Sequence, residues 1–162
     1  MYSTKAFDSL LLLISSIKYI SALATMPVAF SDSNYVVTTL PVTWSEAYVL
    51  CQQNGMNLVS IKSAEEQDAL AKALSFYGSP GDSHNRYWTA GRRFGRNSFV
   101  WFTDGEPLVY NNFAHGEPNN LKGAEGCIEF VNYSKKTSKW NDIACSKKAG
   151  YVCQVRNVLC QK

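Results

Sequence analysis

The sequence has few charged residues and very little histidine. Of its 162 residues, 18% are Asp, Glu, Lys or Arg and two are His, whereas an average soluble domain is about 25% charged. The formal net charge of +3 is too small to indicate a nucleic-acid partner, because such domains concentrate many more Lys and Arg on one face. His84 and His115 lie far from each other and from any uncommitted cysteine, so no zinc-site spacing is present.

The common catalytic motifs are also missing. The sequence contains neither a Gly-x-Ser-x-Gly elbow nor a His-Glu-x-x-His helix. Glu117 and Glu125 could form the carboxylate pair of a glycosidase, but the metal-ligand interpretation given below explains them better. We therefore expect a protein that is not an enzyme.

Long apolar runs are confined to the N-terminus. Lys5 precedes an apolar run from residue 10 to 17, and small residues follow up to Ala24, which is the order of a secretory signal. The alternative, a membrane anchor, needs about 20 apolar residues and would carry Lys18 into the lipid. We predict cleavage after Ala24, secretion into the extracellular space, and no membrane span.

Apolar residues make up 46% of the chain and aromatic residues 13%. This composition is typical of one packed globular domain and excludes a collagen-like or disordered chain. The predicted organisation is a signal peptide (1–24), a short N-terminal segment (25–33), one domain (34–155) and a C-terminal tail (156–162).

All five cysteines follow the predicted signal peptide, and in an oxidising compartment they indicate disulfides. Four cysteines allow three pairings, and the spacing alone does not select one. The fifth is free, paired in an alternative way, or bonded to a second chain. Cys160 lies in the tail, where a chain-linking disulfide would give a homodimer.

Two helices are predicted by capping boxes. Thr43 and Glu46 have the spacing in which each side chain bonds the other's backbone N–H, and apolar residues then recur with helical period until Asn54-Gly55. Ser63 and Glu66 repeat the signature before a helix that carries Leu70 and Leu74 on one face. Short strands are expected at 34–39, 58–61, 87–91, 99–102, 127–132 and 150–155.

Trp44, Trp88 and Trp101 lie in these segments, and core packing is the better expectation for all four tryptophans than stacking against a ligand. The segment from Asp104 to Gly126 is long, polar and without periodicity. Loops of that length in compact domains are usually functional, so we place the working part of the molecule there.

Oxygen-donating side chains gather in this loop and in a second stretch nearby. The loop supplies Glu117, Asn119 and Glu125, and Trp140 is followed by Asn141 and Asp142. Carboxylate and amide oxygens are the ligands that Ca²⁺ prefers. Each fragment alone is an ordinary turn signal, but both lie close to a cysteine, and a bridge between Cys127 and Cys145 would bring them together.

These residues resemble the C-type lectin domain over about 34–155. The resemblance is carried by Trp44-Ser45-Glu46-Ala47, Leu58-Val59-Ser60-Ile61, Trp101-Phe102-Thr103-Asp104-Gly105, Glu117-Pro118-Asn119, Trp140-Asn141-Asp142 and Gly150-Tyr151-Val152-Cys153. It implies an α+β fold with two helices flanking small antiparallel sheets and a long calcium-binding loop region. It also implies the disulfides Cys51–Cys153 and Cys127–Cys145, and a cis bond before Pro118.

The resemblance further implies a function. One calcium ion would be held by Glu117, Asn119, Glu125, Asn141 and Asp142, and the same residues would bind two adjacent hydroxyls of a sugar. In this family Glu-Pro-Asn is associated with mannose, fucose, glucose or N-acetylglucosamine, and Gln-Pro-Asp with galactose. The implied protein is a secreted lectin that binds cell-surface or glycoprotein glycans, for example in innate immunity; the alternative is a related domain that binds galactose-type sugars or a protein.

Three further expectations concern the surroundings of this site. Asn120 and Gly126 stand where many family members carry acids of an auxiliary calcium site, so we predict a single ion and a loop whose order depends on it. Arg92, Arg93 and Arg96 could meet sulfated or phosphorylated glycans, but we expect them to be solvated. Asn132-Tyr133-Ser134 is an available N-glycosylation sequon.

Overall fold

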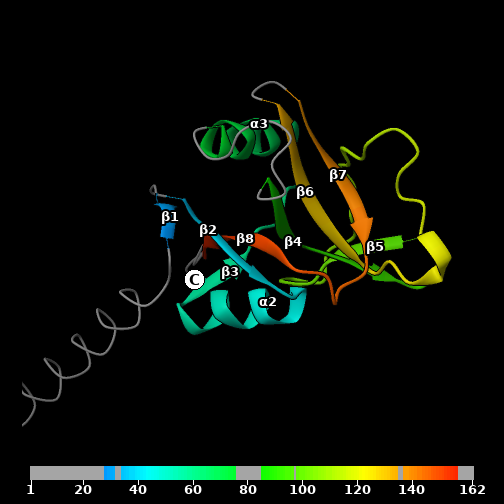
Figure 1. Ribbon diagram of the computed structural model, residues 1–162, viewed down its shortest axis with the longest axis horizontal. Coiled ribbons are helices and arrows are strands. Elements are labelled where there is room, and N and C mark those ends of the chain that lie inside the picture. The colour runs from blue at the N-terminus through cyan, green and yellow to red at the C-terminus, as the bar shows by residue number, and fades with distance from the viewer. Residues whose placement is uncertain (1–27, 32–33, 76–84, 97, 135–136, 157–162) are drawn as a thin grey trace, which may run out of the picture.

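The computed structural model describes residues 28–31, 34–75, 85–96, 98–134 and 137–156 (Figure 1). In chain order its elements are β1 (Val28–Ser31), β2 (Tyr35–Val42), α2 (Trp44–Gln53), β3 (Met56–Leu58), α3 (Ala64–Leu74), β4 (Arg86–Phe94), β5 (Ser98–Trp101), the short 3₁₀ helix η1 (Leu121–Gly123), β6 (Cys127–Ser134), β7 (Thr137–Ile143) and β8 (Ala149–Val155). Within this described part, no helix is long and apolar enough to cross a membrane.

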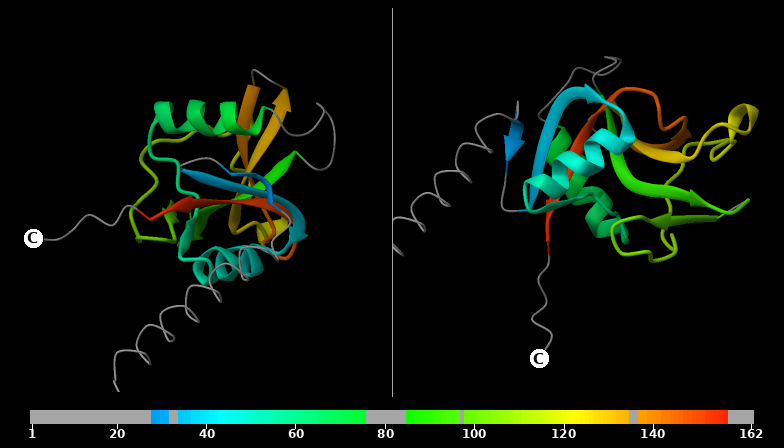
Figure 2. Two further views of the ribbon diagram at one scale, coloured as in Figure 1. Left: turned by 90° about the vertical axis from the view of Figure 1, so that its left-hand side faces the viewer. Right: turned by 90° about the horizontal axis from the view of Figure 1, so that it is seen from below.

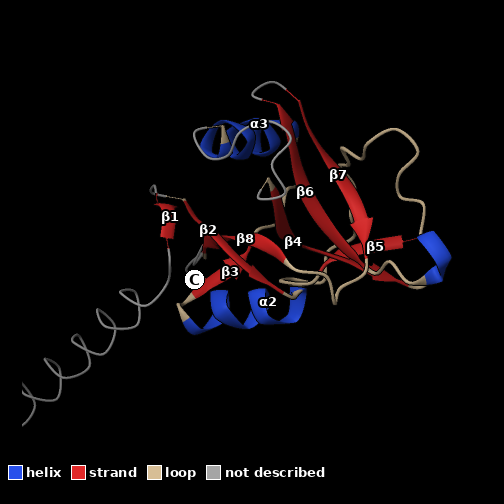
Figure 3. Ribbon diagram, viewed as in Figure 1, coloured by secondary structure: helices blue, strands red, loops and turns tan. Residues whose placement is uncertain are grey.

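Both predicted helices are present, and their starts follow the predicted caps. The Thr43 N–H donates to Glu46 Oε2 at 2.7 Å, and Thr43 Oγ1 accepts the Glu46 N–H. The Ser63 hydroxyl accepts the Glu66 N–H at the start of α3. The two helices lie on opposite sides of the central strands, as Figures 2 and 3 show.

The strands form one connected network in the order β1-β2-β8-β4-β6-β7, with β3 added on β8 and β5 on β4. Every pair is antiparallel except β4 with β8. The α+β expectation is therefore confirmed, although the small sheets are joined rather than separate. Strand β7 was not predicted: Asn141-Asp142 alone is a turn signal, but these residues pair with β6.

The four tryptophans are core residues, as expected. Trp44, Trp88, Trp101 and Trp140 are each at most 2% exposed. Trp140 contacts the ring of Trp101 edge-on and donates its indole N–H to Gln67 Oε1 of α3 at 2.8 Å. The strand that carries Asn141 and Asp142 is therefore fixed on one side by the buried core.

Two disulfides hold the chain together. Cys51–Cys153 joins α2 to β8, and Cys127–Cys145 joins the start of β6 to the segment after β7. This is the pairing that the resemblance implies. The second bridge closes only 18 residues of sequence and brackets the strand pair that leads to the predicted ligands.

The two ends of the described domain meet at one edge. The Val155 N–H donates to the Asn34 carbonyl at 2.9 Å, and Tyr35 is paired with Gln154. Figure 2 shows this edge at the opposite end of the molecule from η1. The N- and C-terminal strands therefore lie away from the loop region.

Gly150 has no room for a side chain. A Cβ atom built there would lie 2.6 Å from the Thr38 carbonyl oxygen and 3.0 Å from Cδ1 of Tyr87. The Thr38 carbonyl is part of the backbone and cannot move aside as a flexible side chain can. We therefore expect Gly150→Ala to lower the free energy of unfolding by about 1–3 kcal/mol, which urea denaturation would measure. Gly126→Ala, whose Cβ would make an ordinary 3.5 Å contact with Cys145 Sγ, is the control and should change it by less than about 0.5 kcal/mol.

Candidate functional site

The long loop before β6 is attached to β7 through Trp140. The Ala114 N–H donates to the Trp140 carbonyl at 2.9 Å, and the Trp140 N–H donates to the Asn112 carbonyl at 3.0 Å. The rings of Tyr110 and Phe113 pack edge-on against the indole. These contacts place the loop beside Asn141 and Asp142, and η1 projects beyond the strands at the right of Figure 1.

The turn at Glu117 and Asn119 is closed by its own polar groups. The Asn119 N–H and its side-chain amide donate to the two Glu117 oxygens at 3.1 and 2.9 Å. The Glu117–Pro118 bond is cis, as the resemblance implies. The amide nitrogen of Asn119 therefore faces Glu117, and its carbonyl oxygen keeps its acceptor capacity.

Asp142 holds this turn through hydrogen bonds to its backbone. Its side chain is fully buried, and its oxygens accept the N–H groups of Asn119 and Asn120, each at 2.9 Å. It also forms an ion pair with the Arg93 guanidinium. Asp142 thus links the end of β7 to the Glu117–Asn119 turn and to β4.

Glu125 closes the far end of the same loop. Its Oε2 accepts the Leu121 N–H at 2.8 Å, and its own N–H donates to Asn120 Oδ1 at 3.1 Å. Asn120 has a left-handed backbone (φ 47°), which Asn adopts more readily than most residues. The Asn120 side chain therefore fixes the short η1 segment on which Glu125 depends.

The acidic groups are close enough to influence one another. Burial raises the pKa of the Glu117 carboxyl above its ordinary value, and a hydrogen bond to Asp142 and the charges of Asp142 and Glu125 raise it further; the Asn119 N–H acts in the opposite direction. Like charges held together disfavour the ionised form. A bound cation would remove that cost.

Asn141 is held by a second ion pair. Its side-chain amide donates to Glu129 Oε1 at 2.8 Å, and the buried Glu129 carboxylate receives both Nε and Nη2 of Arg86. Glu129 lies opposite Asn141 in the β6–β7 register. Because the amide nitrogen is engaged there, the Asn141 carbonyl oxygen is the atom available to a cation.

The donor set fits calcium by its chemistry. Glu117, Asn119, Glu125 and Asp142 are joined by the hydrogen bonds above, and Asn141 is adjacent to Asp142. Among the described residues, no three His, Cys, Asp or Glu side chains lie as a ready metal cluster. The carboxylates here accept backbone N–H groups, and Asp142 pairs with Arg93. Yet three crowded acids and two amide oxygens are the hard donors that Ca²⁺ takes.

The sequence did not reveal the supporting residues Arg86, Arg93 and Glu129. The expectation that the basic cluster is solvated is wrong for Arg93, whose side chain is 14% exposed. Arg92 lies with its guanidinium carbon 4.8 Å from the Trp44 ring centroid. Two signals were available in the sequence. Strand alternation sends Arg92 and Arg93 to opposite faces of β4, so one of the two can be buried. The acid Glu129 stands between two core residues of β6.

Other predicted residues lie apart from this site or outside the described part. Asn132 is 7% exposed, and its side-chain nitrogen donates to the Leu74 carbonyl. A glycan on this buried nitrogen would displace that contact, so we do not propose glycosylation there. Cys160, His84 and the predicted signal peptide lie outside the described residues.

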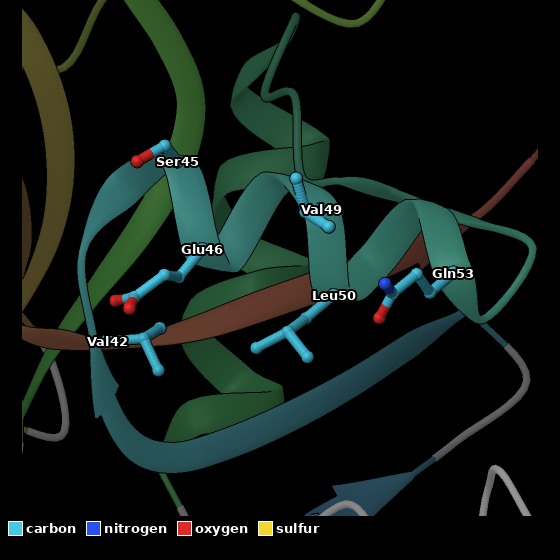
Figure 4. Close-up of a pocket in the computed structure, with 6 residues that line it drawn as sticks. All are labelled: Val42, Ser45, Glu46, Val49, Leu50 and Gln53. Carbon is cyan, nitrogen blue, oxygen red and sulfur yellow. The ribbon is translucent and has the colours of Figure 1, made fainter.

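Two hollows are relevant to the location of function. One, of about 370 Å³, is lined by residues that include Phe99, Phe113 and Glu117, so it adjoins the candidate site. The other, of about 520 Å³, lies against α2 and is shown in Figure 4; it is lined by Val42, Ser45, Glu46, Val49, Leu50 and Gln53. Its single carboxylate, Glu46, is engaged by the Thr43 cap, so it offers no comparable donor set.

Comparison with known proteins decides the family. The family profile described as the Lectin C-type domain matches residues 40–155. The chain belongs to the C-type lectin family. Curated relatives include human E-selectin, 34% identical over 84% of this chain and 22% of the selectin, and rabbit E-selectin, 37% identical over 69% of this chain and 20% of the selectin.

A relative of comparable length and solved structures agree with this family assignment. Salivary C-type lectin 2 of Aedes albopictus is 29% identical over 76% of this chain and 84% of its own length. The cow C-type carbohydrate-recognition domain of CD23, solved in the presence of a GlcNAc2Man3 oligosaccharide, is 30% identical with a TM-score of 0.63, covering 83% of this chain and 95% of that one. The lectin CEL-I from Cucumaria echinata has a TM-score of 0.66 at 24% identity, covering 79% and 94%, and supports the fold.

These findings confirm the C-type lectin fold and support carbohydrate binding. They also confirm that the chain is not an enzyme, because its relatives are non-enzymatic lectins and selectins. The chain corresponds to only about a fifth of the E-selectins it matches. The activity of those longer proteins therefore does not transfer to it directly.

Proposed function

We propose that this chain is a secreted, calcium-dependent lectin that binds mannose, fucose or N-acetylglucosamine on cell-surface or glycoprotein glycans, in recognition such as innate immunity. The observation that carries the proposal is the link between the Glu117–Asn119 turn and buried Asp142. Glu117, Asn119, Glu125, Asn141 and Asp142 would hold one Ca²⁺. When bound, the ion supplies a positive centre to which two neighbouring sugar hydroxyls can add their oxygens.

The side chains set the selectivity through their hydrogen-bonding character. The Glu117 carboxylate only accepts hydrogen bonds, whereas the Asn119 amide can donate from its nitrogen while its oxygen serves the cation. A hydroxyl pair placed between them meets an acceptor on one side and a donor on the other. This order favours mannose-type sugars within the family.

The affinity for one sugar should be weak because much of the ligand stays in contact with water. A dissociation constant near 1 mM corresponds to about 4 kcal/mol. Two sites joined through Cys160 would bind a glycan-coated surface more strongly. This homodimer stays a prediction, as does secretion.

A glycan array tests the proposal directly. The full chain should bind mannose- or fucose-terminated glycans in Ca²⁺ and lose that binding in EDTA. The double variant Glu117→Gln with Asn119→Asp should move the preference toward galactose, while Glu106→Gln, a surface acid paired with Lys62, should bind as the wild type does. Galactose preference in the wild type, or binding that survives EDTA, would instead support the galactose or protein-binding alternative.

A further inference from the structure

Arg93 forms an ion pair with Asp142, one of the acids of the candidate site. Its Nε donates to the Glu125 carbonyl at 2.8 Å, and Nη2 donates to Asp142 Oδ2. Nη1 donates to the Arg96 carbonyl at 3.2 Å, and the guanidinium carbon lies 4.5 Å from the Phe99 ring centroid. All three guanidinium nitrogens therefore donate to protein oxygens, and one aromatic ring packs against the group.

These contacts join three separate parts of the chain. Arg93 belongs to β4, Glu125 ends the long loop, and Asp142 belongs to β7. The backbone adds a further link, because the Arg93 N–H donates to the Gly126 carbonyl at 2.9 Å. A planar guanidinium can bond several fixed acceptors at once, which a lysine ammonium cannot do with the same geometry.

The charge of Arg93 also matters for the site. Glu117, Glu125 and Asp142 supply three negative charges, and Arg93 neutralises one of them. The remaining formal charge of −2 equals that of one Ca²⁺ with opposite sign. Asp142 is fully buried, and a buried carboxylate without a partner would be costly.

We propose that Arg93 is a built-in cation that orders the calcium loop before the ion arrives, by fixing Asp142 and the Glu125 end of the loop together. The inference deepens the proposed function and rests on it for the identity of the ion. It adds a second source of order to a loop that is expected from its sequence to depend on the calcium ion. Arg93 acts through Asp142 and Glu125, so it is a positioning residue and not a ligand.

Amide hydrogen exchange tests the proposal without calcium. The Asn119 and Asn120 N–H groups donate to Asp142, so in EDTA they should be protected in the wild type. In the Arg93→Gln variant in EDTA, these two amides should exchange at least about tenfold faster than in the wild type, while the amides of β8 stay protected. Arg93→Lys should recover little of the difference. The matched control is Arg92→Gln, the adjacent arginine on the opposite face of β4, and it should leave both amides unchanged.

Calcium titration supplies the second readout. Arg93→Gln should raise the calcium dissociation constant by about tenfold, because binding must then order the loop. Unchanged exchange at Asn119 and Asn120 in the EDTA arm, full recovery by Arg93→Lys, or tighter calcium binding by Arg93→Gln would each overturn the proposal. If the wild type bound no calcium, the proposed function would fail, but the EDTA arm would still test the role of Arg93.

Discussion

Asp142→Asn should abolish calcium-dependent glycan binding and also destabilise the fold. The substitution removes one of the three acids, and it leaves the Arg93 guanidinium, 14% exposed, without its carboxylate. Removing one partner of a buried ion pair typically costs about 3–5 kcal/mol. We therefore expect a loss of this order in the free energy of unfolding, measured in urea with EDTA, and no detectable heat on calcium titration.

The control for Asp142→Asn is Asp104→Asn. Asp104 pairs with Lys62 at the surface, with 37% of its side chain exposed, and such pairs contribute about 1 kcal/mol or less. A double-mutant cycle of Asp142→Asn with Arg93→Gln should give a coupling of about 1–3 kcal/mol. Additive losses would contradict the ion pair described here.

Glu117→Gln should weaken calcium binding and yet stabilise the calcium-free protein. The pKa of Glu117 is raised above its ordinary value by burial and by the nearby Asp142 and Glu125 carboxylates, so ionised Glu117 opposes folding at neutral pH. Glutamine keeps the shape without the charge. We expect a higher thermal unfolding midpoint in EDTA, and a calcium affinity lowered at least about 100-fold, or ~2.7 kcal/mol.

The same pKa shift predicts how pH acts on the site. A carboxyl whose folded pKa exceeds its unfolded pKa costs stability above the folded value, and that cost disappears as pH falls through it. In EDTA, the contribution of Glu117 to stability should therefore improve on acidification. In Ca²⁺, protons compete for the same oxygens, so the rise in unfolding temperature given by calcium should shrink, beginning above the usual pH range of a glutamate.

Thermal unfolding across pH, with and without calcium, measures both effects. The Glu106→Gln variant, an exposed acid outside the site, is the matched control and should follow the wild type. A Glu117→Gln protein that is less stable than the wild type in EDTA at neutral pH would show that the carboxylate supports the fold. That result would remove the reason for linking its pKa to ion binding.

The sequence predicted what local signals encode. The capping residues Thr43 and Ser63 predict the starts of both helices, because their hydrogen bonds involve neighbours three residues away. Helical periodicity then marked the buried face of each helix. The ligand candidates also stood out, since Glu117 and Asn119 lie in a loop without any apolar pattern.

Non-local pairing was the part that the sequence concealed. Strand β7 contains Asn141 and Asp142, which are turn formers, and its conformation depends on partners across the sheet such as Glu129. The role of Arg93 depends on the convergence of β4, the loop and β7. No short stretch of sequence records that convergence, so the sequence did not show that one arginine of the basic cluster, Arg93, pairs with a buried carboxylate.

The contact between Asn34 and Val155, at the two ends of the predicted domain, has a consequence for orientation. Anything joined to the domain at either end, whether a stalk, an anchor or another copy, would approach from the edge opposite η1 (Figure 2). The loops of the candidate site would then point away from the attachment. Copies tethered through these ends could therefore engage the same opposing surface without obstructing one another.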